Sequence, residues 1–147
     1  MANSVRETII ATVVSTLSAG SPPATVIRSD QFQRTDANAS LPAIMVYPLN
    51  EKVAEQTGST AYRILSLAVE CQVKGAPPID QAIEPLYQWA IQKLLADDTL
   101  GGNAEWIQEV STEWVFETAD EDVCGARITF DIRYSTGRTD PTQTTSG

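Results

Sequence analysis

The chain has 147 residues, of which 10 are Lys or Arg and 19 are Asp or Glu, so its net charge is −9 and its pI is about 4.3. This length predicts one domain, which buries roughly 68–70% of its unfolded surface and needs no disulfides. The sequence has no histidine, which excludes Ser–His–Asp and Cys–His nucleophiles and the usual imidazole zinc sites. The acidic charge also argues against broad binding to nucleic-acid phosphates.

The cysteines and the N-terminal region favour a soluble protein of a reducing compartment. Cys71 and Cys124 lie in apolar runs, where two buried reduced thiols are expected and a disulfide is the alternative. The apolar-leaning stretch Thr8–Leu17 follows an acidic residue and has no basic region before it, unlike a signal peptide. No segment approaches ~18 uninterrupted apolar residues, so no membrane span is predicted.

Residues 4–18 are predicted to form a helix. Ser4 and Glu7 have the spacing of a capping box, and Gly20 provides a stop. An apolar stripe repeats with the period of a helix; it consists of Val5, Ile9, Ile10, Val13 and Leu17. The many β-branched residues also suit a strand, but the caps at both ends and the length favour the helix.

Three strand signals follow this helix. Residues 24–30 predict a short strand, residues 31–41 a polar loop, and residues 43–49 a second strand, in which Pro48 indicates an edge or an end. Residues 61–74 predict a long strand, in which residues 65–73 alternate between two faces, and the polar residues 50–60 connect it to the strand before. A strand of this length spans roughly 45 Å, whereas a domain of this size is only about 40 Å across. The hairpin therefore has to bend strongly or project from the body.

A second helix is predicted over residues 81–96. Residues 75–78 break the chain, and Asp80 is a plausible N-cap. Pro85 lies too far along for a helix capped at Asp80, so the helix either begins later or is kinked there. Residues 97–102 end it with two glycines.

The last part of the sequence predicts a second hairpin and a polar tail. Residues 106–117 and 126–134 alternate in polarity around an acidic turn at residues 119–122. Residues 136–147 have no apolar anchor, and we expect them to be flexible. Four residues on the apolar phase of their elements are predicted to lie in the core: Ile91, Leu94, Trp114 and Phe130.

These elements predict an α+β fold. A mostly antiparallel sheet carries two helices packed on one face, with a long protruding hairpin. Residues 1–135 form a single domain in this prediction, and residues 136–147 form the tail.

No set of residues predicts catalysis. The acidic clusters at 97–98 and 120–122 fall at turns and lack the spacing of an EF-hand, although carboxylates are the ligands of Mg²⁺ and Ca²⁺. Glu70, Lys74 and Asp131 would suit a nuclease-like set, but no further acid supports it. We therefore expect no enzyme activity, no metal and no cofactor.

Trp89 lies about 130° away from the centre of the second helix's apolar stripe. It predicts either the edge of a helix packed under a loop or a subunit interface, where tryptophan is enriched.

Four segments carry a resemblance to a known family. They are Leu41–Val46, Leu94–Gly102, the strand pair with Trp114 and Ile128–Tyr134, and Tyr134–Pro141. The sequence resembles the small tail-terminator (tail-completion) proteins of long-tailed bacteriophages from about Val5 to Pro141, whereas Glu51–Thr60 and the Thr-rich C-terminus have no counterpart there.

The resemblance implies a structural virion protein. Such proteins form a hexameric ring that caps the tail tube, stops its polymerisation and offers a surface to the head–tail connector. It implies assembly in the host cytoplasm, a place in the virion tail, and as partners further copies of the chain, the tube protein and the connector. No membrane and no specific nucleic acid is expected as a partner. The alternatives are another head–tail joining protein or neck adaptor, and a small metal-dependent hydrolase.

The candidate interaction residues lie in the hairpin tip, in the second helix and in the tail. For contacts with another subunit, the tube or the connector, the sequence predicts Glu51, Lys52, Glu55, Gln56, Trp89, Arg138 and Asp140.

Overall fold

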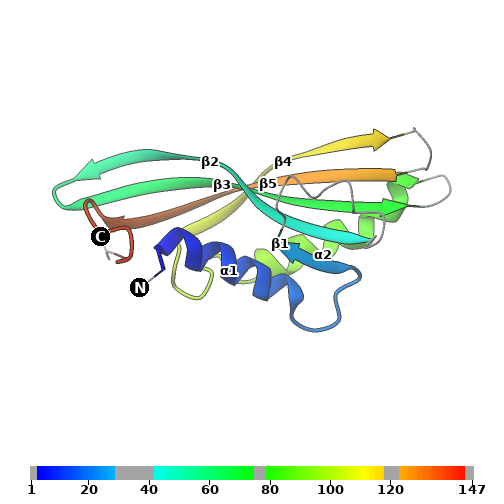
Figure 1. The fold of residues 1–147 in the computed structure, drawn as a ribbon, viewed down its shortest axis with the longest axis horizontal. Helices are drawn as coiled ribbons and strands as arrows, with labels where there is room; N and C mark the ends of the chain where they lie inside the picture. The colour runs from blue at the N-terminus through cyan, green and yellow to red at the C-terminus, as the bar shows by residue number, and fades with distance from the viewer. Residues whose placement is uncertain (1–2, 29–41, 75–78, 118–122, 145–147) are drawn as a thin grey trace.

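The computed structural model describes residues 3–28, 42–74, 79–117 and 123–144 (Figure 1). The predicted loop 31–41, the break at 75–78 and the turn at 119–122 lie outside the described residues. The elements in chain order are α1 (Val5–Ser18), β1 (Thr25–Arg28), β2 (Ala43–Thr57), β3 (Thr60–Lys74), the 3-10 helix η2 (Ile79–Ile83), α2 (Glu84–Leu94), β4 (Trp106–Glu117) and β5 (Val123–Gly137).

The five strands form one sheet in the order β1-β2-β3-β5-β4. β1 pairs in parallel with β2, and the other three pairs are antiparallel. The helices α1 and α2 lie along one side of the sheet, which twists strongly along its length (Figure 1). The predicted α+β class with a mostly antiparallel sheet is thereby confirmed.

The helix α1 follows its sequence pattern closely. Its five buried residues are the five of the predicted apolar stripe. The Ser4 side chain accepts a hydrogen bond from the backbone N–H of Glu7 at 3.1 Å, which satisfies one free donor at the helix start. The β-branched Thr12 is accommodated inside the helix because its hydroxyl donates a hydrogen bond to the Thr8 carbonyl, 2.8 Å away. The competing strand interpretation is therefore wrong.

The start of the second helix differs from the Asp80-capped prediction. Residues 79–83 form a turn of 3-10 helix, and α2 itself begins at Glu84, so Asp80 is not its N-cap. Pro85 then falls in the first turn, where its fixed φ and missing N–H cost nothing. Of the two alternatives for Pro85, the later start is correct.

Two of the four predicted core residues are wrong or only partly right. Leu94 and Phe130 are fully buried, whereas Ile91 is partly buried and Trp114 is 47% exposed. Trp114 pairs with the buried Ala126 and so shares the helix side of the sheet, but β4 is the last strand in the order. Alternation along a strand predicts which side a residue faces, and it does not predict whether a helix reaches over that residue.

The hairpin of β2 and β3 is longer than predicted. Residues 50–57, expected as part of a polar connection, continue the strand, and the turn itself is only Gly58 and Ser59. Gly58 has a φ of +58°, a backbone conformation that suits glycine in a tight hairpin turn. The hairpin extends past the helices to one end of the molecule (Figure 1). The predicted projection is confirmed.

The chain after residue 135 differs from the predicted flexible tail over its described part. β5 continues through Gly137 beside β3, and Thr136 is buried. The segment 138–143 then folds back with backbone hydrogen bonds. A polar segment can order without an apolar anchor where it satisfies the backbone of a neighbouring strand end.

Both cysteines are free and buried, which confirms the prediction of reduced thiols. Burial raises the pKa of Cys71 to about 12, so this thiol has no thiolate character. Among the described residues, no helix has the length and apolarity needed to cross a membrane.

Candidate assembly surfaces

A polar junction ties α1 to the projecting hairpin. The Glu51 carboxylate accepts a hydrogen bond from the Tyr134 hydroxyl at 2.5 Å and one from the Arg6 guanidinium at 3.1 Å. Arg63 lies 3.6 Å from the same carboxylate, whose side chain is only 12% exposed. Burial and the hydrogen bond to Glu51 raise the pKa of Tyr134, so its hydroxyl stays a donor. Glu51, predicted to meet a partner, is therefore used inside the subunit.

The junction encloses a small open cavity of about 120 Å³. Its lining consists of Ser4, Arg6, Glu51, Arg63, Tyr134 and Pro141. The lining carries two guanidinium groups and one carboxylate, and both Arg6 and Arg63 lie within 4 Å of the Glu51 carboxylate.

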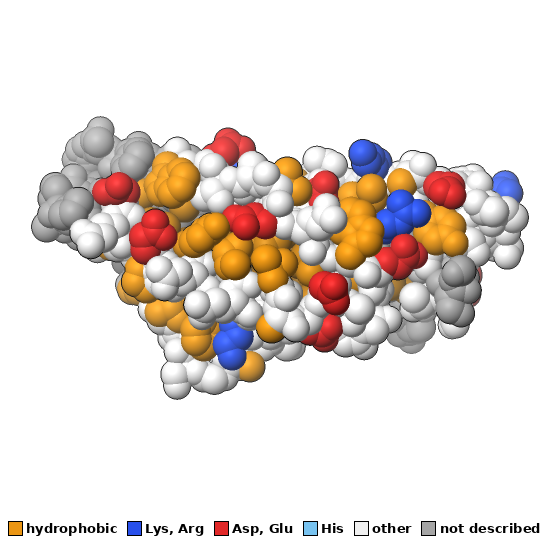
Figure 2. All heavy atoms as spheres, turned by 180° about the vertical axis from the view of Figure 1, so that it is seen from behind, with side chains coloured by type: hydrophobic (Ala, Val, Ile, Leu, Met, Phe, Trp, Pro, Cys, Tyr) orange, Lys and Arg blue, Asp and Glu red, His pale blue; other side chains and the backbone are white. Residues whose placement is uncertain are grey.

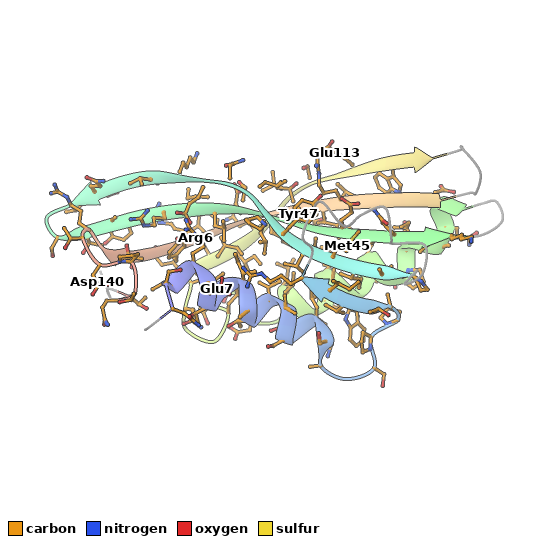
Figure 3. The ribbon with its side chains drawn as sticks, in the orientation of Figure 1. Arg6, Glu7, Met45, Tyr47, Glu113 and Asp140 are labelled. Atoms are coloured by element: carbon orange, nitrogen blue, oxygen red, sulfur yellow. The ribbon has the colours of Figure 1, made fainter. Side chains whose placement is uncertain are left out.

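The C-terminal segment closes the same end of the molecule. The backbone N–H of Arg138 donates to the Ser59 carbonyl at 2.6 Å, and Val5 donates to the Pro141 carbonyl at 2.8 Å. Asp140 accepts a hydrogen bond from the Thr142 backbone at 3.0 Å, and the bonds from Thr142 lower the pKa of Asp140. Figure 3 shows Asp140 beside the hairpin end and Arg6 at the start of α1. The segment therefore clamps the hairpin turn and the N-terminus of α1 together.

The predicted tip residues Lys52, Glu55 and Gln56 are exposed, like every residue from 52 to 59. Arg138 has an exposed side chain near them, since its backbone bonds to the hairpin turn. The structure thus brings Lys52, Glu55, Gln56 and Arg138 to one end of the molecule, with Asp140 beside them. They form the surface that we call the hairpin tip, residues 52–59 with Arg138.

Trp89 lies elsewhere, at the end of α1. Its indole Nε1–H donates to the Leu17 carbonyl at 2.8 Å, and the Lys93 ammonium stands 4.7 Å from the ring centroid. A side chain at Gly20 would come within 3.5 Å of the same ring. The helix-edge interpretation accounts for Trp89, which fixes the end of α1 against α2.

A row of one apolar and three charged residues crosses the face of the sheet opposite the helices, and sequence reasoning missed it. Met45, Glu70, Arg127 and Glu113 follow one another at one register of β2, β3, β5 and β4. The Tyr47 hydroxyl donates to Glu70 at 2.6 Å, and Met45, Tyr47 and Glu70 are all buried. Figure 3 shows Tyr47 and Met45 along β2 and Glu113 on β4. The alternation of β3 places Glu70 on this face. A sheet with helices on one face predicts that the other face is exposed, so the burial of Glu70 could not be predicted.

The Asp97 loop explains one of the resembling motifs in structural terms. The Asp97 carboxylate accepts backbone hydrogen bonds from Thr99 at 3.1 Å and Gly101 at 2.9 Å, and the bond from Gly101 contributes most to its lowered pKa. Leu100, with a φ of +49°, is thereby held in the core, and Gly101 also has a positive φ. This acidic pair at residues 97–98 thus orders a turn.

The acidic side chains of the described residues do not gather into a metal-binding cluster. No group of three or more Asp, Glu, Cys or His side chains in the described part of the chain is placed to hold a metal ion. In the nuclease-like set, Glu70 bonds to Tyr47, while Asp131 accepts from Ser66 at 2.9 Å. No protein-family model matches the chain, and a search of curated proteins found no match.

Two pairs of exposed apolar residues remain among the described residues, one on β2 and one on β4. β2 exposes Leu49 and Val53, which are 38% and 46% accessible, and β4 exposes Val110 and Trp114, which are 54% and 47% accessible. Seen from behind in Figure 2, hydrophobic side chains reach the surface in several clusters flanked by acidic ones.

Proposed function

We propose that the protein is a structural virion protein, a tail terminator that forms a hexameric ring on the end of the tail tube. It acts by binding and not by catalysis: it stops tube polymerisation and presents a surface to the head–tail connector. It is assembled in the host cytoplasm and remains in the tail.

The observation that carries this proposal is the projecting hairpin. Residues 52–59 are exposed throughout and stand at the far end of a sheet whose body is covered by helices. Ordering such a strand pair costs conformational entropy, and the hydrogen bonds of the Glu51 junction and of the C-terminal segment offset this cost. A stiff polar projection of this kind suits docking onto a neighbouring subunit or a tube.

The acidic charge supports the same role. A net charge of −9 repels DNA phosphates, which favours a ring through which DNA has to slide without sticking.

The direct test is the mass of the assembled protein and its effect on tubes. Six copies of a 15.9 kDa chain give about 95 kDa, which native mass spectrometry resolves from a monomer. Purified protein added to growing tubes of the matching tube protein is expected to stop their elongation and to appear as a ring at the tube end. A ring that binds the connector but leaves tube growth unchanged would instead indicate a head–tail joining protein. A monomer with metal-dependent hydrolase activity would refute both structural functions.

The tip can be tested separately from the fold. The triple variant K52A/E55A/Q56A removes exposed side chains only, so its circular dichroism and unfolding midpoint should match those of the wild type. We expect it to lose tube capping. The control is E84A/Q88A, which changes exposed residues of α2 far from the tip and should cap normally. Capping by the tip variant at wild-type strength would remove the hairpin tip from the mechanism.

A further inference from the structure

The sheet has two different free edges within the described part of the chain. β4 is the last strand and pairs there only with β5. On the other side, β1 covers only Ala43–Val46 of β2, which leaves residues 48–57 paired only with β3. An unpaired strand presents a row of backbone donors and acceptors, which is a template for another strand.

The two edges match in length and in the apolar groups that they expose. Each offers about ten residues and carries two exposed apolar side chains four positions apart, Leu49 and Val53 on one and Val110 and Trp114 on the other. Val53 is in register with Arg63 and Tyr134, and Trp114 is in register with Ala126. Since Tyr134 and Ala126 belong to the helix-side core, Val53 and Trp114 face the same side of the sheet.

The two edges differ in charge, since only the free part of β2 contributes a cation. β4 contains three Glu and no Lys or Arg, and its Glu113 lies 3.4 Å from Arg127 of its own subunit. The free part of β2 contains Lys52 and Glu55, and its Glu51 is bonded within its own subunit. Two β4 edges paired with each other would bring together six Glu without a cation from either strand, and this acidic contact is unfavourable. β4 therefore suits the free edge of β2 better than it suits a second β4.

We propose that β4 of one copy pairs antiparallel with the free part of β2 in the next copy, with Lys52 opposite Glu113. This register places Val53 opposite Thr112 and diagonal to Trp114, within reach of an aromatic side chain. No two carboxylates then stand directly opposite each other across the pair. Because the two edges differ, each copy adds head to tail, and a ring results where the rotation closes. The inference specifies the subunit contact of the proposed ring and rests on that self-assembly.

The experiment blocks one edge at a time and then mixes the variants. Trp114→Asp disables β4 and Val53→Asp disables β2, and both sites are exposed, so unfolding midpoints should stay near that of the wild type. Each variant alone is expected to associate about tenfold or more weakly than the wild type in sedimentation. The 1:1 mixture is expected to form a heterodimer that does not grow, because only one intact contact is available. Leu95→Asp, exposed at the end of α2, is the control and should associate normally.

A charge exchange tests the register. Lys52→Glu alone should weaken association, and adding Glu113→Lys in the same chain should restore most of it. The inference is overturned if Val53→Asp still associates like the wild type, if the mixture does not form a heterodimer, or if the wild type stays monomeric at the highest concentration reached. The proposed function has a separate test, because it fails only if the wild type also forms no ring on a tube. If both edge variants still form rings, only the strand pairing is overturned.

Discussion

The helix-covered body and the projecting hairpin end are held together by different forces. In the body, α1 and α2 bury one face of β3 and β5, and residues such as Ile9, Leu94 and Phe130 have no exposure. At the hairpin end, the contacts are polar: the Glu51 junction and the backbone bonds of residues 138–143. Apolar burial scales with area, whereas a hydrogen bond adds only about 1 kcal/mol net. The body therefore supplies the stability, and the hairpin end is kept in position by directional bonds.

This difference suits an assembly protein. A region that opens at low cost can adjust when it docks, while a region with higher local stability preserves the fold. The hairpin end should thus exchange its amide hydrogens faster than the covered part of β3. The predictions below are ordered by expected effect and separate the two regions.

The largest effect is expected in the body. Phe130→Ala removes a fully buried ring from the centre of β5 and should cost about 3–5 kcal/mol of unfolding free energy. Denaturant unfolding measures this loss, and a variant that no longer folds agrees with it. An unchanged midpoint would show that the hairpin end, and not the helix-covered core, dominates the stability.

The Asp97 loop comes next because it holds an apolar residue in the same core. Leu100→Ala should cost about 2–5 kcal/mol, since Leu100 is fully buried beneath the loop. Asp97→Asn keeps the shape but weakens the hydrogen bonds to Thr99 and Gly101, and we expect a smaller loss. Thermal unfolding of both variants measures the two losses of stability and shows which is larger. A larger loss for Asp97→Asn than for Leu100→Ala would contradict it.

The junction at the hairpin end should respond locally. Tyr134→Phe removes the donor to Glu51 and should cost about 1–2 kcal/mol, with faster hydrogen exchange near residues 51–63 and little change in residues 67–71. Tyr87→Phe is the matched control, because it removes a phenol that bonds to the exposed Glu109 at 2.7 Å. Equal effects from the two substitutions, or exchange that rises uniformly along β3, would argue against a separate junction.

The smallest effect concerns pH. The hydrogen bond from Arg28 lowers the pKa of Glu7 below its ordinary value of 4.5. A lowered folded-state pKa stabilises the fold above that ordinary value, and the contribution is lost as the pH falls through the lowered pKa. Glu7→Gln should therefore cost a few tenths of a kcal/mol at neutral pH, as exposed ion pairs do, and nothing in strong acid. A difference between the two proteins that persists in acid would assign Glu7 another role.

Part of the candidate site could be predicted from the sequence because it depends on local chemistry. A polar stretch in a strong hairpin has to be exposed, and Lys52, Glu55 and Gln56 are exposed. Glu51, one residue away from them, could not be separated from that group, because its inward side is set by a bulge between Pro48 and Asn50 in β2. A bulge adds one residue and so reverses the alternation that a strand pattern assumes.

The sequence by itself determined the α+β class, the α1 stripe and its cap, the alternation of β3 and β5, and the projection of the hairpin, because these follow from periodicity and from chain length. Only the tertiary structure decided that Trp114 is exposed, that Trp89 closes α1 onto α2, and that residues 136–143 clamp the hairpin. Each of these outcomes depends on which element lies over or beside another, and that is a property of strand order and of contacts distant in sequence. A local sequence pattern predicts which way a side chain points, whereas the packed structure determines which residues that side chain contacts.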